Sequence, residues 1–324
     1  MLEHGHKSKK GTDIIMTIYE ILDDIHSDRV KKVIIDSDTY NEMDDQYAIA
    51  YAIGCEKLKV DSLCATLFNN PRCDGFADGM EKSYAEILHL LSVIGRDVPT
   101  YKGCAAPLTV NDETIREADM APAVENIIKT ARESDEIVYV IALASITNIA
   151  AAIMLAPDIK EKICVIWVGC NCLENGAGGE FNFGQDPKAG QYVLSCGVPL
   201  VLLPAIGDVG HGTQVLIGNK CNLDEAFTGD HPIDRFFRDD LPSSCDIEYA
   251  EKPNTWWHVF WDIAGPAVLS IPEAFDLEIM DAPRIRGDWT YAIGEPDRPK
   301  MIYMHCLNRE KVMRDAFEKI NSLK

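Results

Sequence analysis

The feature that most constrains the fold is a regular alternation of apolar, β-rich runs with helical patterns. The predicted strands cover Lys32–Ser37, Leu58–Phe68, Ile137–Ala142, Ile163–Gly169 and Pro199–Leu203. The helical patterns between them cover about Met43–Gly54, Gly75–Gly95, Ala121–Arg132, Ile146–Leu155 and Pro187–Ser195. This alternation predicts βαβ units and a mostly parallel sheet with helices on both faces. We therefore expect a single α/β domain with a Rossmann-like sheet, whose ligands bind beyond the carboxyl ends of the strands.

The two ends of the chain and one later segment are patterned differently. Residues 1–12 are expected to be a disordered leader, so the domain covers residues 13–324. From about 222 to 256 the pattern loosens, which predicts an insertion or a lid. Asn254–Leu269 is predicted to be a helix that Pro266 could kink. Asn308–Ser322 has the pattern of an amphipathic helix.

The charge balance excludes some classes of partner. The chain has 31 basic and 52 acidic residues, a net charge of −21, which argues against nucleic acid and anionic membranes. It fits a small neutral or cationic ligand, or serves solubility. The start lacks the apolar segment of a signal peptide and no run is long enough for a membrane helix. Eleven cysteines without a CxxC motif, among them Cys64 and Cys164 in apolar runs, favour reduced thiols and a cytoplasmic protein.

Four aspartates cluster directly after the first predicted strand, in the stretch VIIDSDTYNEMDDQYAIA. Asp36 and Asp38 lie at the carboxyl end of the strand, and Asp44 and Asp45 open the next helix. Capping and the helix dipole could explain the second pair. They do not explain why the first pair converges on the same turn. A hard cation would, because Ca²⁺ and Mg²⁺ bind oxygen ligands.

Two enzyme families resemble parts of this stretch. DSDT after an apolar strand matches the DxDx[TV] loop of haloacid-dehalogenase-like phosphatases, in which Asp36 and Asp38 would act with Mg²⁺. That resemblance leaves Asp44 and Asp45 unused. The later acidic loop of that family is only half present, since IGDVGHG supplies Gly207 and Asp208 but no second aspartate.

The second resemblance, to the nucleoside hydrolases of the inosine–uridine type, uses all four aspartates. Their signature DxDPGxDDxxA is similar to the stretch from Asp36 to Ala48. Four more fragments follow in the family's order: ATLFNN, ALASITNIAAA, GGEFNFGQDPKA and WDIAGPAVLSIP. Each fragment is weak by itself, but five in order, each at a predicted strand end or helix start, are specific.

The resemblance implies a bound Ca²⁺ that holds the ribose hydroxyls and a water. Its carboxylate ligands would be Asp38, Asp45 and Asp262, with the backbone carbonyl of Thr147 as a further ligand. Asp38 would also be the general base toward the water. The implied reaction is hydrolysis of the N-glycosidic bond of a nucleoside to ribose and free base, and the implied assembly is a homodimer or homotetramer.

The resemblance also implies substrate contacts. Asp44 and Asn70 would bind ribose hydroxyls, Glu180 and Asn182 the 5′ side, and Asn175 is a looser candidate. Asp36 would support the loop. Simpler interpretations remain open: Thr147 and Asn148 could cap a helix, Glu180 and Asn182 could be ordinary loop residues, and Asp262 could lie on a solvated face.

This chain departs from the family pattern in two places. Asp38 and Asp44 are six residues apart where the signature has four, so TYNEM forms a larger turn from which Tyr40 or Asn41 could reach the pocket. Trp261 stands where many members have a histidine before the late aspartate, which resembles the purine-preferring members, in which stacking replaces a leaving-group acid.

His258 lies four residues before Asp262, so on a helix the two would share a face. It could be a packed histidine or a relocated leaving-group acid, and His211 is a weaker candidate for that role. A different class of function also remains open, namely a protein of this fold that binds a nucleoside or sugar without turnover.

Overall fold

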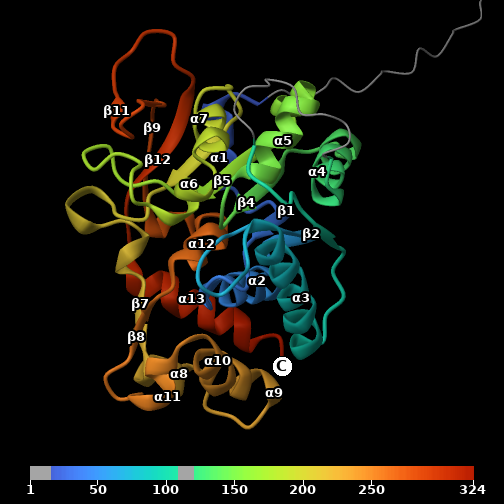
Figure 1. The fold of residues 1–324 in the computed structure, drawn as a ribbon, viewed down its shortest axis with the longest axis vertical. Coiled ribbons are helices and arrows are strands. Elements are labelled where there is room, and N and C mark those ends of the chain that lie inside the picture. Colours follow the sequence, from blue (N-terminus) through green and yellow to red (C-terminus); the bar gives the residue numbers. More distant parts are fainter. Residues whose placement is uncertain (1–15, 109–119) are drawn as a thin grey trace, which may run out of the picture.

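The computed structural model describes residues 16–108 and 120–324, so the predicted leader lies outside the described residues. Its centre is an eight-stranded sheet in the order β3-β2-β1-β4-β5-β6-β12-β9 (Figure 1). The strands are β1 (Lys31–Ser37), β2 (Leu58–Ala65), β3 (Thr100–Lys102), β4 (Val138–Ala142), β5 (Ile163–Val168), β6 (Leu200–Leu203), β9 (Phe275–Asp281) and β12 (Lys300–Leu307). Only the pair β9–β12 is antiparallel among these neighbours. The predicted single α/β domain with a mostly parallel sheet is confirmed.

Helices cover both faces of the sheet (Figure 1). One face carries α4 (Pro122–Glu133), α5 (Thr147–Leu155) and α7 (Pro187–Val193), and the other carries α2 (Asp44–Gly54), α3 (Phe76–Ile94), α12 (Ala264–Ser270) and α13 (Arg309–Asn321). α1 (Ile18–Ile25) packs against β12. Because the central strands are covered on both sides, every residue of β4 and β5 is buried, and such strands appear in a sequence as continuous apolar runs. Within the described residues, no helix has the length and apolarity needed to cross a bilayer.

The helix predicted over Asn254–Leu269 is wrong. This segment contains β8 (Trp257–Val259), which pairs antiparallel with β7 (Ile217–Asn219), then a 3₁₀ turn at Trp261–Ile263, and then α12. Aromatic and β-branched residues fit a pleated strand at least as well as a helix, and pairing with β7 decides between them. Pro266 lies in the first turn of α12, where a missing N–H is tolerated. It therefore does not kink a longer helix.

Three strands of the sheet were not predicted, namely the short edge strand β3, β9 and β12. β12 lies between β6 and β9 and pairs parallel with β6 through Ile302 and Tyr303. β9 forms the antiparallel edge, and only Phe275 of its residues is fully buried. A half-exposed edge strand lacks the continuous apolar run that marks β4 and β5. A small hairpin of β10 (Arg284–Ile285) and β11 (Tyr291–Ala292) connects β9 with β12.

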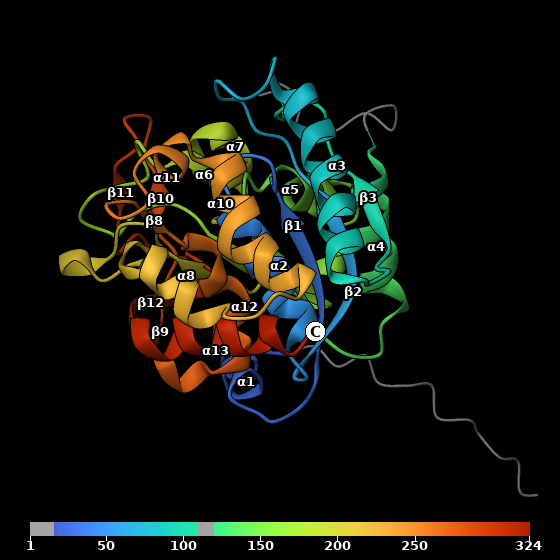
Figure 2. The ribbon, with the colours of Figure 1, turned by 90° about the horizontal axis from the view of Figure 1, so that it is seen from below.

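The segment from 222 to 256 forms an ordered helical layer outside α2 and α13. Its helices are α8 (Lys220–Ala226), α9 (Pro232–Arg235), α10 (Leu241–Cys245) and α11 (Ile247–Glu251), with a π-helical turn at Phe236–Asp240 (Figure 1 and, from below, Figure 2). Tyr47 of α2 joins this layer to the domain, since its ring packs against Phe227 and Phe237 and its hydroxyl donates to the Phe237 carbonyl. Whether the layer acts as a lid stays a prediction.

Candidate functional site

A cavity of about 220 Å³ lies at the carboxyl ends of β1, β4 and β5. Its size is below the ~300–1,000 Å³ typical of sites for drug-sized ligands, which suits a small ligand. Six of its lining residues are acidic and, among the described residues, no Lys or Arg lines it. The six are Asp38, Glu42, Asp44, Asp45, Glu180 and Asp262. The cavity therefore favours a cation, or a ligand rich in hydroxyl groups.

The first aspartates reach the cavity because β1 ends at Ser37 and α2 begins at Asp44. Ser37 Oγ donates to Asp45 Oδ1 at 2.5 Å, and Asp44 Oδ2 accepts the backbone N–H of Asp262 at 3.2 Å. The second contact brings the 3₁₀ turn before α12 against the start of α2. Met43 is the N-cap of α2 and makes no side-chain cap, so capping does not explain this acidic pair.

Burial and mutual repulsion make the aspartate cluster costly. Asp38, Asp45 and Asp262 are at most 4% exposed. Burial first, and then the neighbouring carboxylates, raise the pKa of all three well above the usual value. Asp38 Oδ2 is buried and has no hydrogen-bond partner among the described residues. An all-oxygen donor set with an unsatisfied oxygen fits a hard divalent cation.

The carboxylates with metal-ligand spacing are Asp44, Asp45 and Asp262, whose ligand atoms lie within 4.8 Å of one another. Asp45 and Asp262 were expected as metal ligands, whereas Asp44 was expected to bind ribose. Asp38 lines the same cavity but lies outside this group of three. The structure thus brings all four residues to one cavity, and the division of their roles stays a prediction.

Thr147 does not line the cavity. Its hydroxyl donates to Asp186 Oδ2 at 2.8 Å, and the residue begins α5. Leu143, at the end of β4, does line the cavity, and its carbonyl accepts a hydrogen bond from Asn182. Leu143 is therefore better placed than Thr147 to offer a backbone oxygen to a cation in the cavity.

The predicted asparagines are placed differently from one another. Asn70 lies behind the cavity wall and donates to Oδ1 of the lining residue Asn41 at 2.7 Å. Asn175 is exposed and does not line the cavity. Asn171, which was not predicted, is 5% exposed and does line it. Its place just after β5, where ligands bind in such sheets, was the available clue.

Glu180 and Asn182 both line the cavity, and both also hold its wall together. The Glu180 carboxylate accepts backbone N–H groups of Cys170, Asn182 and Phe183 at 2.7–2.8 Å. Burial raises the pKa of Glu180 to about 7 in spite of these donors. Asn182 Nδ2 donates to the carbonyls of Leu143 and Val168 at 3.0 and 2.9 Å, which joins the ends of β4 and β5.

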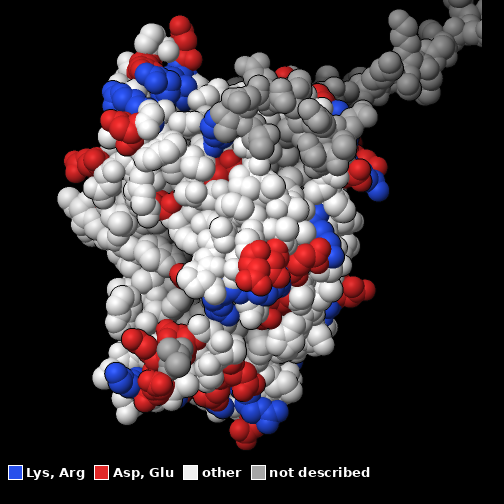
Figure 3. Space-filling view, in the orientation of Figure 1, with Lys and Arg blue, Asp and Glu red and all other residues white. Residues whose placement is uncertain are grey.

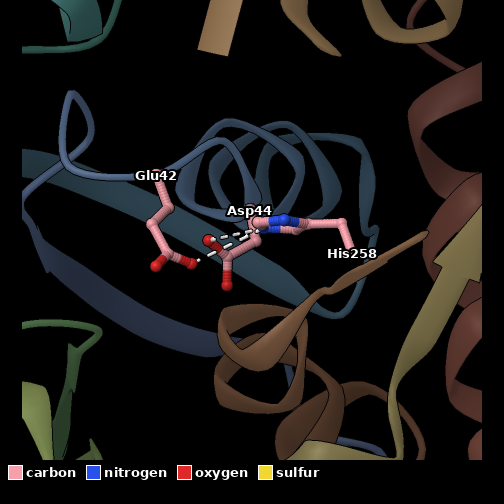
Figure 4. A group of neighbouring side chains, drawn as sticks. All are labelled: Glu42, Asp44 and His258. Carbon is pink, nitrogen blue, oxygen red and sulfur yellow. Dashed lines mark ion pairs between the residues drawn. The ribbon is translucent and has the colours of Figure 1, made fainter. Parts of the chain in front are cut away.

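The aromatic candidate lies at the cavity, while the histidines do not. Trp261 is half-buried and lines the cavity. His258 does not line it and shares no helix face with Asp262, because His258 lies on β8. Its Nε2 instead faces the carboxylates of Glu42 and Asp44 (Figure 4). His211 is exposed and lies outside the lining residues.

Asp36 lies beneath the cavity and is fully buried. Its Oδ1 accepts from Asn148 Nδ2 at 2.7 Å, while Oδ2 has no partner among the described residues. Burial raises its pKa to about 7, against the hydrogen bond from Asn148, which lowers it. Asp208, the second acid of the phosphatase alternative, pairs with His305 away from the cavity.

Comparison with known proteins agrees with this geometry. Residues 33–283 match the model of the family described as inosine-uridine preferring nucleoside hydrolase. A pyrimidine-specific ribonucleoside hydrolase of Escherichia coli O1:K1 is 29% identical over 194 residues, and one of Citrobacter koseri is 30% identical over the same length. Each alignment covers 53% of this chain and 59% of the relative, so the chain spans about three fifths of the length of these curated relatives.

Solved structures share the fold. A purine-preferring ribonucleoside hydrolase from Gardnerella vaginalis has a TM-score of 0.70 and 20% identity, and a plant nucleoside hydrolase has 0.69 and 19%. Both comparisons cover 90% of this chain and 99% of the other. On the family match over most of its length, the chain belongs to the inosine-uridine preferring nucleoside hydrolase family.

Proposed function

We propose that the protein hydrolyses the N-glycosidic bond of ribonucleosides and releases ribose and free base. The observation that carries this proposal is the buried group of Asp38, Asp44, Asp45 and Asp262 in one cavity of a nucleoside hydrolase fold. Six acidic lining residues also favour the positive charge that develops on a sugar when its glycosidic bond breaks. The same charges repel a phosphate group, so a nucleoside suits the cavity better than a nucleotide.

The metal in this proposal is Ca²⁺. Asp38, Asp44, Asp45 and Asp262 offer only oxygen atoms, and Leu143 adds a carbonyl at the same cavity, which suits the irregular oxygen coordination of Ca²⁺. A bound cation would acidify water in the cavity and bind ribose hydroxyls.

The chain's own residues divide the remaining work. Asp38, with an unsatisfied oxygen in the cavity, accepts a proton from the attacking water. Asp44 and Asn41 bind ribose hydroxyls, with Asn70 holding Asn41 in place. Asn171 and Asn182 contact the 5′ side of the sugar, while Glu180 fixes the backbone around them.

The base would stack on Trp261, which favours purines because the larger ring system covers more of the indole face. Curated relatives carry pyrimidine-specific names and one structural neighbour a purine-preferring name, so the choice depends on this wall of the cavity. The proposal also includes a cytoplasmic location and a homodimer or homotetramer, which light scattering tests as a multiple of the 36.0 kDa chain.

A nucleoside panel tests the proposal. Purified protein with Ca²⁺ should release free base from inosine and guanosine faster than from uridine and cytidine. Addition of a chelator should abolish release, and excess Ca²⁺ should restore it. Saturable nucleoside binding without release of base from any member of the panel would contradict hydrolysis and favour a binding protein.

A further inference from the structure

Two side chains of the cavity lining and one beside the cavity form a second group with the spacing of metal ligands. One ligand atom each of Glu42, Asp44 and His258 lies within 4.8 Å of the other two. His258 Nε2 is 3.6 Å from Glu42 Oε2 and 4.0 Å from Asp44 Oδ1, and the three side chains point toward one another (Figure 4). Glu42 comes from the enlarged turn before α2, and His258 comes from β8.

These separations are longer than hydrogen bonds and close to the distance between two ligands of one metal ion. N–H···O hydrogen bonds span about 2.7–3.2 Å. Zinc binds histidine nitrogen and carboxylate oxygen at about 2.0–2.2 Å, so two such ligands at tetrahedral to trigonal angles are about 3.4–3.6 Å apart. The pair of His258 and Glu42 already has this separation. Asp44 Oδ1 is 4.0 Å from His258 Nε2, a few tenths of an ångström beyond it, and the ligand atoms of Asp44 and Glu42 lie within 4.8 Å of each other.

The imidazole of His258 is unsatisfied and is held in its orientation by packing. Its Nε2 is buried and has no hydrogen-bond partner among the described residues. The ring stacks on Trp256 at 6.2 Å with an interplanar angle of 5°, and its edge meets Phe260 at 5.7 Å. Trp256 itself is anchored because its indole N–H donates to Asp246 at 2.7 Å. The nitrogen is therefore directed at the two carboxylates by its neighbours.

The cavity carries more negative charge than one divalent cation can balance. Glu180 accepts several backbone N–H groups, which leaves Asp38, Glu42, Asp44, Asp45 and Asp262 to face the cavity. One divalent cation balances two of these five carboxylates. Figure 3 shows both acidic and basic side chains spread over the visible surface. The Asp44 side chain is buried, whereas the Glu42 side chain is 47% exposed, so a second divalent cation would chiefly reduce the repulsion between Asp44 and its buried neighbours.

We propose that Glu42, Asp44 and His258 bind a second divalent cation of the zinc class, beside the cation held by Asp45 and Asp262. Asp44 belongs to both groups and would contact both ions. Imidazole favours Zn²⁺ and similar transition metals over Ca²⁺, so the two sites differ in preference. Three protein ligands leave one coordination position open, as in catalytic zinc sites.

The test measures metal binding and does not depend on nucleoside hydrolysis. Metal-free protein is saturated with Ca²⁺ and titrated with ZnCl₂ alone, in a His4→Ala, His6→Ala background that removes the two leader histidines. We expect one additional Zn²⁺ per chain with Ca²⁺ retained. Glu42→Gln and His258→Asn should each weaken Zn²⁺ binding at least about tenfold. When Co²⁺ replaces Zn²⁺, its absorption should show a nitrogen ligand in the unsubstituted protein and in Glu42→Gln, and this signal should be lost only in His258→Asn.

His305→Asn is the matched control. His305 also lies between two carboxylates, but its two nitrogens make hydrogen bonds of 2.9 and 2.7 Å to Asp208 and Glu278, which leave no space for an ion. This variant should bind Zn²⁺ as the unsubstituted protein does. Unchanged Ca²⁺ stoichiometry and circular dichroism establish that the variants fold. Zn²⁺ that displaces Ca²⁺ one for one, binds equally well to Glu42→Gln and His258→Asn, or fails to bind would overturn the proposal.

Discussion

Asn148 Nδ2 donates a hydrogen bond to Asp36 Oδ1 over 2.7 Å and joins two sequence motifs that are 112 residues apart. The side-chain oxygen Oδ1 of Asn148 accepts the backbone N–H of Cys104 at 2.8 Å. Both Asn148 and Asp36 are fully buried. The pair connects the end of β1 to the start of α5 directly beneath the acidic cavity.

Asn148→Leu should therefore destabilise the fold strongly. The substitution removes the donor to Asp36 Oδ1 and the acceptor of the Cys104 backbone N–H, and an unsatisfied buried group costs about 1–3 kcal/mol. We expect a loss of roughly 2–4 kcal/mol in the free energy of unfolding, measured by urea titration. Asn126→Ala is the control, since it removes one hydrogen bond to Ser62 at a half-buried position. Equal losses in the two variants would contradict the importance of the pair.

Asp45→Ala and His258→Ala should have unequal effects on turnover. Asp45 lies in the cavity among the proposed cation ligands, so its loss should reduce kcat by about a thousandfold or more. His258 does not line the cavity, so His258→Ala should keep most activity when Ca²⁺ is the only metal supplied. Steady-state kinetics with inosine measure both. Equal and complete loss in both variants would refute the stacking model, because it would make His258 an essential leaving-group acid.

Trp261→Ala should lower the preference for purines. An aromatic stacking pair contributes about 0.5–1.5 kcal/mol beyond burial, so kcat/KM for inosine should fall about 2- to 12-fold more than for uridine. Trp257→Ala is a matched control, because Trp257 is 61% exposed and does not line the cavity. An equal fall for both nucleosides in Trp261→Ala would show that the indole does not select the base.

Glu180→Gln should change how stability depends on pH. The folded protein holds the pKa of Glu180 at about 7, above the ordinary value of 4.5. Because the folded pKa is the higher one, protonated Glu180 stabilises the fold fully below pH 4.5, and this contribution is lost as the pH rises to about 7. The free energy of unfolding of the unsubstituted protein, minus that of Glu180→Gln, should fall by on the order of 2–3 kcal/mol across this range and stay constant above it.

Urea titrations at several pH values between 4.5 and 8 measure this difference. Glu174→Gln, an exposed substitution in the same loop, serves as the control and should show the pH dependence of the unsubstituted protein. A difference for Glu180→Gln that does not vary with pH would contradict the assigned pKa.

The parts of the fold that were predictable are those with a local pattern. β4 and β5 are buried along their whole length, so their sequences are apolar runs that need no partner to be recognised. β9 escaped prediction because its half-exposed pattern is shared with loops. β12 does contain a buried apolar run, Met301–Met304, for which no strand was predicted. Trp257–Val259 was assigned to a helix because the strand depends on pairing with Ile217–Asn219, some 40 residues earlier, which local sequence does not contain.

The candidate site divides in the same way. The sequence by itself determined the α/β class, the family resemblance and the candidate carboxylates Asp38, Asp44, Asp45 and Asp262. Strand ends and motifs can be read from short stretches of sequence, and the order of the motifs can be read along the chain without knowing its fold. Only the tertiary structure decided that Asn171 lines the cavity while Asn175 does not, and that His258 faces Glu42 and Asp44. The physical reason is that a side chain's neighbours across the cavity come from distant segments, and their approach depends on the packing of the whole sheet.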